Sequence, residues 1–391
     1  MKTSVITPVQ GDDACLLEQF TTKQMATDNK PHCRQIQVWY QHGLNGIPYS
    51  AIVTQPKGRV LLLDNCNSSV LDANIKYHLT SSVTVLVVPT FYAIVFLLGL
   101  PANGIAFWVL LFKSKKMPST LLLINLAAAD LFFLLALPFK IVYHFLGNNW
   151  IFGETMCQLV TAVFYGNMYC SVFFLMAISI DRYFALVHPF LARSLRGWRS
   201  FASVATGIWL VVIAGVSIFF LVPQIKTFTD PNMTTCHDVW AVCYGYEWYT
   251  TYFLVLFIVG YAIPLIIIFI CYVSIWFTLS RNRGSHSQVM RLIILVVFMF
   301  IICFTPSNIL LIFHYLETQW DCHNQLYIWY MVAFCLTSFN SCIDPFIYYY
   351  MSEDCRQMVK DTLGWSSSGD KESVDCTKRT KLTSEMGRIS T

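Results

Sequence analysis

Seven long apolar runs, separated by short polar connectors, fill most of the chain after residue 82. They are Val83–Phe112, Ser119–Phe145, Thr155–Val187, Phe201–Pro223, Trp248–Leu279, Leu292–Tyr315 and Gln325–Tyr350. Each run is long enough to cross the hydrocarbon core of a bilayer, about 30 Å thick, as a helix. Run length and the absence of strict alternation favour helices over strands. We therefore predict an all-α membrane protein whose residues 83–350 form a seven-helix bundle.

The third run serves as a reference for the others. Cys157 lies near its start, and no charge follows until Asp181-Arg182-Tyr183 at its end. An acid–base pair at the foot of a membrane span is costly unless it is paired or solvated. We therefore expect Asp181 and Arg182 to belong to a functional site.

The distribution of charge orients the bundle. Only 12% of the 391 residues are charged, against about 25% in soluble domains, and the net charge of +4 gives no support to a nucleic-acid partner. The odd-numbered connectors hold the basic residues Lys113, Lys115, Lys116, Arg182, Arg193, Arg196, Arg199, Arg281, Arg283 and Arg291. The even-numbered connectors hold only Lys140 and Lys226, beside six acidic residues. The positive-inside rule then predicts an extracellular amino terminus and a cytoplasmic carboxyl terminus.

Residues 1–82 are predicted to form a flexible extracellular tail. The tail contains the basic segment Lys57-Gly58-Arg59, followed by the peptide Val60-Leu61-Leu62-Leu63-Asp64-Asn65. Basic residues in exposed tails are natural sites for trypsin-like proteases. Cleavage after Arg59 would make Val60 a new amino terminus. The alternative is an incidental basic spot in a linker, and the rival cut sites are Lys57, Arg34 and Lys76.

Other features of this side concern processing. Asn67 and Asn232 each begin an Asn-X-Ser/Thr triplet and are glycosylation acceptors if they are extracellular. Met1–Gln10 lacks the apolar stretch of a secretory signal. Either the first span directs insertion, or this amino terminus is an unusual gene product.

Residues 351–391 are predicted to form a cytoplasmic helix and tail. Met351–Lys360 fits a short amphipathic eighth helix on the inner leaflet, with Cys355 as a palmitoylation candidate. The tail after it is rich in hydroxyl groups, at Ser366, Ser367, Ser368, Ser373, Thr377, Thr380, Thr383 and Ser384. It is either a phosphorylation region that a partner reads or simply a soluble tail.

A group of polar residues lies at similar depth within the spans. Asp130 is the only acidic residue of the second run, and the others are Asn103, Ser171, Asn340, Ser341 and Asp344. A carboxylate in mid-membrane needs a cation or a proton. Oxygen ligands suit sodium, so the two readings are a sodium site and a protonated Asp130 in a neutral network.

Several spans contain proline, which kinks a helix and suits a bundle with two packings. The prolines are Pro89, Pro101, Pro138, Pro223, Pro264, Pro306 and Pro345. A transporter or channel is the alternative class, although no repeat relates the two halves and no selectivity filter is evident.

Taken together, residues 83–360 resemble the rhodopsin-like G-protein-coupled receptors. The motifs are Gly99-Leu100-Pro101-Ala102-Asn103, Leu126-Ala127-Ala128-Ala129-Asp130, Cys157, Asp181-Arg182-Tyr183, Trp209, Pro264 with Tyr272, Cys303-Phe304-Thr305-Pro306, and Asp344-Pro345-Phe346-Ile347-Tyr348. Phe304 and Asp344 depart from the tryptophan and asparagine of many members. The last span has no lysine, which excludes a retinal Schiff base.

A narrower set of motifs resembles the protease-activated receptors. It includes Asn148-Asn149-Trp150, Phe164-Tyr165-Gly166-Asn167-Met168-Tyr169, Thr235-Cys236-His237-Asp238-Val239, Phe304-Thr305-Pro306-Ser307-Asn308 and His314-Tyr315. His188-Pro189, Ala192–Gly197 and Cys66 are similar to the fourth member, whereas Pro56-Lys57-Gly58-Arg59 is similar to the second. The peptide Val60–Leu63 matches no ligand of the family that we can place.

The resemblance implies a multi-pass plasma-membrane receptor with no enzymatic activity. An extracellular serine protease, thrombin-like or trypsin-like, would cut between Arg59 and Val60, and Val60–Asn65 would act as a tethered agonist. The candidate ligand contacts are His237, Asp238, Tyr315, His314, Tyr165 and Tyr143, with Asp238 meeting the new ammonium group. Core packing is the alternative role for each aromatic residue.

The resemblance further implies a disulfide between Cys157 and Cys236 and an inner switch made of Asp181, Arg182, Tyr183, Tyr272 and Tyr348. The partners of such a receptor would be heterotrimeric G proteins, arrestin on the carboxyl-terminal tail and membrane lipids. The resemblance implies no cofactor beyond a sodium ion at Asp130. A receptor for a diffusible peptide or lipid is the second reading.

Overall fold

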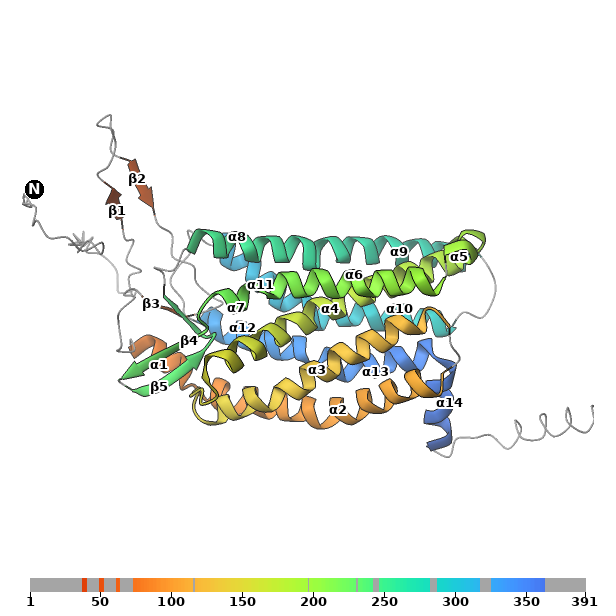
Figure 1. Ribbon diagram of the computed structural model, residues 1–391. Helices are drawn as coiled ribbons and strands as arrows, with labels where there is room; N and C mark the ends of the chain where they lie inside the picture. The colour runs from red at the N-terminus through yellow and green to blue at the C-terminus, as the bar shows by residue number, and fades with distance from the viewer. Residues whose placement is uncertain are drawn as a thin grey trace, which may run out of the picture. The chain divides into compact units, whose positions relative to one another are not determined.

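The computed structural model describes residues 37–40, 49–52, 61–63, 73–114, 117–195, 197–229, 231–241, 246–281, 287–316 and 325–362 (Figure 1). Several predictions fall outside these residues, namely those on Arg34, Lys57, Arg59, Val60, Asp64, Asn65, Cys66 and Asn67 and on the hydroxyl-rich tail after residue 362. Only the backbone is described for Leu61–Leu63, His314 and Tyr315.

Seven helices within the described part of the chain are long and apolar enough to cross a membrane. They are Lys76–Phe112, Thr120–Phe145, Gly153–Val187, Trp198–Leu221, Thr251–Arg281, Val289–Leu310 and Tyr327–Met351. Each overlaps one of the seven apolar runs in order, so the predicted all-α, seven-helix fold is confirmed.

Most spans consist of more than one helical segment. In chain order the segments are α1 (Ala73–Leu79), η1 (Val83–Val87), α2 (Val88–Phe112), α3 (Thr120–Phe145), α4 (Gly153–Val187), α5 (Pro189–Leu195), α6 (Trp198–Val216), α7 (Ile218–Leu221), α8 (Tyr246–Phe257), η2 (Ile258–Ala262), α9 (Ile263–Arg281), α10 (Ser287–Met299), η3 (Phe300–Phe304), α11 (Thr305–Leu316), α12 (Gln325–Ser338), α13 (Asn340–Met351) and α14 (Glu353–Thr362). The predicted eighth helix corresponds to α14.

The π-helical turns η1, η2 and η3 share one position relative to proline. Each ends two residues before a proline, at Pro89, Pro264 and Pro306. A proline lacks the N–H that would bond the carbonyl four residues earlier, and its ring clashes with that carbonyl. That earlier residue lies inside the π-turn in all three cases, so widening of the helix relieves the clash. The proline kinks expected from the sequence therefore take this form in three of the spans.

The strands form three pairs. β1 (Gln37–Tyr40) and β2 (Tyr49–Ile52) are antiparallel and belong to a separate unit of the chain. β4 (Ile225–Thr229) and β5 (Asn232–Cys236) form an antiparallel hairpin in the loop after α7. β3 (Leu61–Leu63) runs parallel to β6 (Val239–Ala241) of the same loop.

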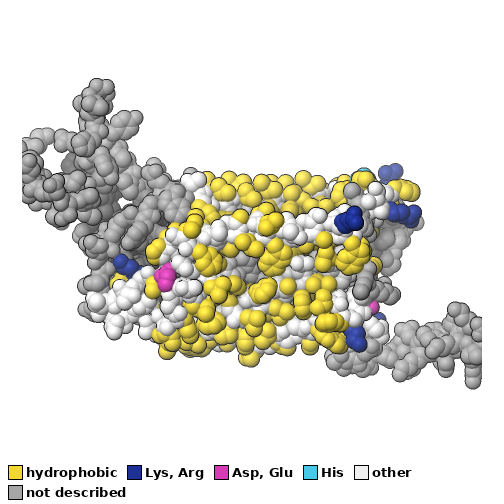
Figure 2. Space-filling view, viewed as in Figure 1, with side chains coloured by type: hydrophobic (Ala, Val, Ile, Leu, Met, Phe, Trp, Pro, Cys, Tyr) yellow, Lys and Arg dark blue, Asp and Glu magenta, His cyan; other side chains and the backbone are white. Residues whose placement is uncertain are grey.

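The helix α4 occupies the middle of the bundle. It packs against α3, α6 and α9, and its buried residues run from Cys157 at one end to Asp181 at the other. Large apolar side chains such as Leu97, Phe132 and Phe269 remain exposed on the outer faces of the spans. Figure 2 shows hydrophobic side chains along one face of the bundle, with most visible Lys and Arg side chains at the end that carries α5 and α14. We refer to the opposite end, with α1 and β4–β5, as the outer end.

The structure differs from the sequence prediction at two places near the outer end. The first span begins at Lys76 rather than Val83, because α1 and η1 extend the helix into the predicted flexible tail. The amide of Asn148 and the hydroxyl of Thr84 both donate hydrogen bonds to the carbonyl of Leu79 and hold this extension. Lys140, which was counted with the connector, lies inside α3 and is buried.

The close approach of η2 to α4 predicts a measurable packing effect. A Cβ on Gly260 would come within 2.5 Å of the buried Tyr169 ring, whereas a Cβ on Gly104 would meet nothing within 4 Å. We expect Gly260→Ala to destabilise the protein by about 1–3 kcal/mol through overpacking. Gly104→Ala should be neutral or stabilise by up to about 1 kcal/mol, because alanine favours helix. Melting of both purified variants in detergent tests this, and equal Tm values would contradict it.

Candidate functional site

The second outer loop is joined to the start of α4 by a disulfide bond. Cys157 and Cys236 are both fully buried, and their Cα atoms lie 5.8 Å apart. This is the pairing that the family resemblance implies, and it fits the oxidising side of the membrane. The bond places the residues that follow Cys236 directly above the bundle.

Hydrogen bonds to the backbone hold the hairpin β4–β5. The carboxylate of Glu154 accepts bonds from the N–H groups of Gln224 (2.6 Å) and Ile225 (3.1 Å) at the start of β4. The side-chain oxygen of Asn149 accepts the N–H of Thr234 at 2.9 Å, and the N–H of Trp150 donates to the carbonyl of Thr234 at 2.7 Å. The hairpin is therefore fixed to α4 and to the preceding connector as well as by the disulfide.

His237 lies at the turn between β5 and β6 and is held from three directions. Its φ of 69° is in the left-handed region, which few residues other than glycine adopt. Its N–H donates to the carbonyl of Gln224 at 2.9 Å, and its Nδ1 lies 2.7 Å from Oε1 of the same residue. Its Nε2 lies 3.1 Å from the hydroxyl of Tyr165 on α4. The turn thus couples the loop to the middle span.

Asp238 is buried and already has partners. Its Oδ2 accepts a 2.5 Å hydrogen bond from the hydroxyl of Tyr143. The ammonium of Lys140 donates to the carbonyl of Cys236 at 3.3 Å and lies 5.1 Å above the Tyr143 ring, where its charge acts on Asp238. Burial raises the pKa of Asp238, and the positive charge of Lys140 opposes that rise. A new ammonium group would therefore compete with Lys140 for this carboxylate.

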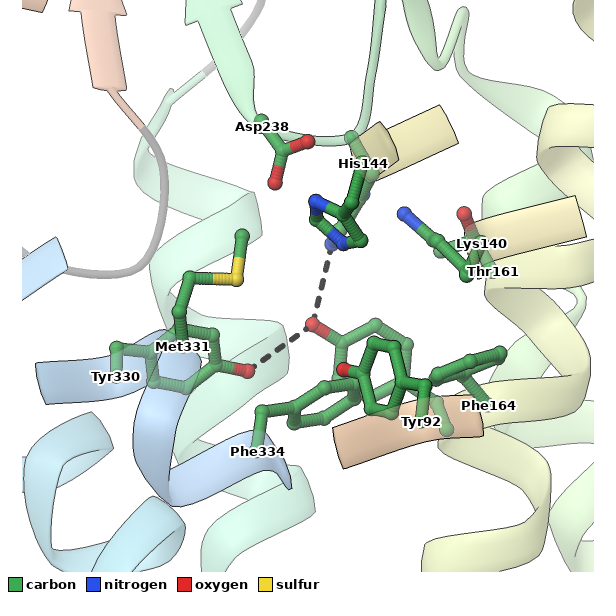
Figure 3. A pocket seen from close by; sticks show the side chains of 11 residues that line it. Tyr92, Lys140, His144, Thr161, Phe164, Asp238, Tyr330, Met331 and Phe334 are labelled. Carbon is green, nitrogen blue, oxygen red and sulfur yellow. Dashed lines mark hydrogen bonds between the residues drawn. The ribbon is translucent and has the colours of Figure 1, made fainter. Parts of the chain in front are cut away.

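His237 and Asp238 contribute to the lining of a small cavity (Figure 3). Its lining residues are Tyr92, Lys140, His144, Thr161, Phe164, Tyr165, His237, Asp238, Tyr330, Met331 and Phe334. The hydroxyl of Tyr165 lies 3.3 Å from that of Tyr330, which ties α4 to α12 across the cavity. Its volume of about 30 Å³ has room for water but not for a leucine side chain. A peptide side chain can enter only if the walls move.

The segment expected to act as a tethered ligand lies beside this loop. Leu61, Leu62 and Leu63 of β3 pair in parallel register with Val239, Trp240 and Ala241 of β6. β6 begins directly after Asp238. The backbone of the ligand segment is therefore adjacent to the predicted binding residues in the uncut chain.

Several residues of the predicted polar core form a hydrogen-bonded network around Asp130. The hydroxyls of Ser341 and Tyr348 donate to its two carboxylate oxygens at 2.8 and 3.1 Å. The amide of Asn340 donates to Ser171 at 3.0 Å, and Ser341 also lies 3.2 Å from Asn340. Asp344 is fully buried beside Asp130, and neither of its oxygens has a hydrogen-bond partner among the described residues.

At the inner end, Asp181 and Arg182 form an ion pair at 3.0 Å. Ser179 donates a hydrogen bond of 2.8 Å to the hydroxyl of Tyr272, and Tyr183 lies 3.1 Å from Nε2 of His188. Tyr348, the remaining member of the predicted switch, bonds to Asp130 instead. In this structure Tyr348 therefore belongs to the polar core, while the other four switch residues lie at the inner end.

The predicted modification sites differ in accessibility. Asn232 is exposed at the tip of the β4–β5 hairpin, where a glycan meets no obstacle from the hairpin. The thiol of Cys355 is buried between α14 and the bundle, and burial raises its pKa. A buried thiol of raised pKa is a poor nucleophile, so palmitoylation there would require α14 to move.

The structure brings together four of the six predicted ligand contacts, namely Tyr143, Tyr165, His237 and Asp238. Sequence reasoning missed the roles of Lys140, Gln224 and Tyr330. The position of Lys140 could have indicated its role, because it is the only basic residue before His144 in the second apolar run. Nothing in the local sequence marks Gln224 or Tyr330, because their partners are distant along the chain.

Comparison with known proteins gives consistent results. A family model described as 7 transmembrane receptor (rhodopsin family) matches residues 102–348. Proteinase-activated receptor 3 from Homo sapiens is 41% identical over 278 residues, which cover 71% of this chain and 74% of the relative. Proteinase-activated receptor 2 from Bos taurus and receptor 4 from Homo sapiens are each 40% identical, over 73% and 72% of this chain and 74% of each relative. Such similar identities do not single out one subtype.

The short bond to Asp238 predicts a stability effect that depends on pH. Tyr143→Phe removes the hydroxyl donor from a buried carboxylate, which should destabilise the protein by about 1.5–3 kcal/mol at pH 7.5. Because the pKa of Asp238 is raised, the folded state holds its proton more tightly than the unfolded chain does. The deficit should therefore shrink on acidification from pH 7.5 to pH 5, because the protonated fraction of Asp238 rises as the pH falls.

Thermal melting of the purified protein at the two pH values measures this deficit. Tyr77→Phe is the control, since its side chain is 68% exposed, and it should change Tm little at either pH. A deficit for Tyr143→Phe that is absent, or that grows on acidification, would contradict the assignment.

Proposed function

The chain belongs to the proteinase-activated receptors of the rhodopsin family, and from this premise we propose that cleavage between Arg59 and Val60 activates it. The family consists of G-protein-coupled receptors, so this chain is a multi-pass receptor of the plasma membrane and not an enzyme. Membership also favours a protease-activated receptor over a receptor for a diffusible ligand, a transporter or a channel.

The observation that carries the proposal is the pairing of β3 with β6. Val60 directly precedes β3, and β3 lies along the loop that holds His237 and Asp238. A cut at Arg59 would therefore free an amino terminus next to the candidate ligand site. The rival site Lys76 lies at the start of a helical span, and helical backbone is a poor protease substrate. Arg34 and Lys57 remain as rivals.

The new amino terminus offers a specific electrostatic change. Val60 would gain a positive charge, and Asp238 is the buried carboxylate closest along the chain to the start of β6. We infer that the ammonium draws Asp238 away from Lys140 and Tyr143, and that the peptide's apolar side chains then enlarge the cavity between α4 and α12. A ligand shifts the receptor only by binding one state better than the other, and these contacts would differ between the two states.

The helix α4 is the proposed route to the inner face. Tyr165, Ser171, Ser179 and the Asp181–Arg182 pair lie on this one helix, which spans about 24 Å from Tyr165 to Asp181 at 1.5 Å per residue. Movement of Tyr165 would thus reach both the polar core and the inner switch. Release of Arg182 from Asp181, with Tyr272 and Tyr348 changing partners, would open the inner end to a heterotrimeric G protein. Arrestin on the carboxyl-terminal tail and lipids around α14 are further proposed partners.

The polar core has the composition of a sodium site. Asp130 and Asp344 are two buried carboxylates side by side, and repulsion opposes their both being charged unless a cation or proton lies between them. Ser171, Asn340 and Ser341 supply neutral oxygens at the same place. The oxygens of Asp344 lie beside Asp130 and accept no hydrogen bond from any donor in the described part of the chain, so they are available to a bound cation, which would supply charge compensation.

The cleavage site is tested by calcium release from cells that express the chain, on addition of trypsin or thrombin. Arg59→Ala should abolish the response, and Lys57→Ala should leave it intact, because only a cut after Arg59 makes Val60 the new amino terminus. Both variants should respond fully to the free peptide Val-Leu-Leu-Leu-Asp-Asn. A protease response retained in Arg59→Ala would move the cut to Lys57, Arg34 or elsewhere.

The sodium proposal predicts ion-specific stabilisation. Replacing choline chloride by sodium chloride should raise the Tm of the purified protein, by the equivalent of about 1.4 kcal/mol at ten times the dissociation constant. Asp130→Asn and Asp344→Asn should each remove this difference, whereas Asp354→Asn on α14 should keep it. Equal Tm values for the native chain in the two salts would instead support a shared proton.

A further inference from the structure

The residues that directly precede strand β6 are held in place by the rest of the structure. The three residues before it are fixed one after another, Cys236 by the disulfide, His237 by Gln224 and Tyr165, and Asp238 by Tyr143. Strand β6 therefore leaves the bundle in a defined direction. A binding edge that is already ordered loses little conformational entropy when a partner strand is added.

The partner strand in this structure is β3, from the uncut chain. The register pairs Leu61 with Val239, Leu62 with Trp240 and Leu63 with Ala241. Strand addition of this kind uses main-chain hydrogen bonds, which place little demand on side-chain identity. Pairing through the main chain would explain how the peptide Val-Leu-Leu-Leu, which has only apolar side chains, can bind at this site.

We propose that β6 is a docking edge for residues 61–63 that is occupied before cleavage, and that release from this edge controls access of the protease. This inference rests on the proposed cut at Arg59. Leu61–Leu63 are the second to fourth residues after that bond. The same backbone groups cannot pair with β6 and lie extended in the cleft of a protease at one time. The docked chain is therefore a poor substrate, and the released chain is the one that is cut.

The docked form must exchange readily with the released form. The β3–β6 pair has three residues per strand, and an isolated two-stranded pair is at best marginally stable. If docking is favoured about tenfold, the released fraction and the cleavage rate both fall about tenfold. Nine residues between β3 and α1 span up to about 30 Å when extended, so release is not restrained by the link to the bundle.

The same edge of β6 can also bind the new amino-terminal segment after cleavage. Val60 is joined to Leu61, and Asp238 is joined to Val239, so parallel register brings the new ammonium and the carboxylate to the same end of the pair. Return of the cut strand to β6 would then deliver the charge to Asp238 without a new search. Before cleavage, the docking edge keeps the chain out of the cleft of the protease. After cleavage, it positions the new amino terminus beside Asp238.

An engineered disulfide between β3 and β6, called the staple below, tests the docking because it can be reversed by reduction. In a Cys66→Ser background, the in-register pair Leu62→Cys with Trp240→Cys should form a disulfide, because in-register Cα atoms lie within the range that a disulfide bridges. The offset pair Leu63→Cys with Val239→Cys is the matched control and should cross-link much less. Intact-cell trypsin treatment with mass spectrometry then measures the rate at which the Val60 amino terminus appears.

We expect the in-register staple to slow this rate at least tenfold and mild reduction to restore it. Trp240→Pro, which removes a backbone donor from β6, should raise the rate of the unstapled chain and weaken its response to the free peptide. Equal cross-linking of the two pairs, or an unchanged rate in the stapled chain, would overturn the proposal. If the cysteine variants do not reach the cell surface, hydrogen–deuterium exchange of the backbone amides of residues 61–63 in the native chain tests the docking instead. Exchange at the rates of a random coil would also overturn the proposal.

A native chain that is cut elsewhere and never yields a Val60 terminus would refute the proposed function instead. Cross-linking and amide exchange would still report on docking in that case. The two failures are therefore distinguishable.

Discussion

The attachment of the second outer loop to α4 is the constraint on which the outer half of the protein depends. The disulfide at Cys236 fixes one point, and a single point would leave the loop free to rotate. His237 and Asp238 remove that freedom by bonding to Tyr165 and Tyr143 on two different helices. The loop thereby becomes an extension of the helical bundle. Any ligand that shifts His237 or Asp238 must also shift side chains of the spans.

Buried carboxylates provide two of the places where a change of charge can alter the packing. Asp238 lies in the second outer loop and Asp130 in the middle of the bundle, and both are almost fully desolvated. Removing one partner from a buried charge costs much more than the intact pair contributes, because the remaining charge stays in a medium of low dielectric. Such sites respond strongly to an added cation. Tyr165 and Ser171 lie six residues apart on α4, so a response at one site reaches the other through a single rigid helix.

The sequence predicts the fold well because membrane spans depend on local hydrophobicity. All seven spans were located. Each π-turn lies just before a proline, but Pro101, Pro138 and Pro345 stand inside α-helices, so a proline alone does not predict where a π-turn forms. The start of the first span was missed because Lys76 and His78 are polar, although tertiary contacts to Leu79 hold that turn. Lys140 was misplaced in a connector for the same reason, since its charge concealed a buried position. The β3–β6 pair joins residues far apart in the chain, and no local pattern contains that information.

Pairing before cleavage changes what cleavage has to accomplish. A contact that is equally strong in the resting and active receptor cannot shift the balance between them. If the backbone of Leu61–Leu63 already lies on β6, its hydrogen bonds add nothing to the difference between the two states. The difference must then come from what the cut creates, which is the ammonium of Val60 and the freedom of its neighbours to enter the cavity. On this argument the protease supplies a charge at a position that the fold has prepared, and the competition for Asp238 between Lys140 and Val60 is the switch.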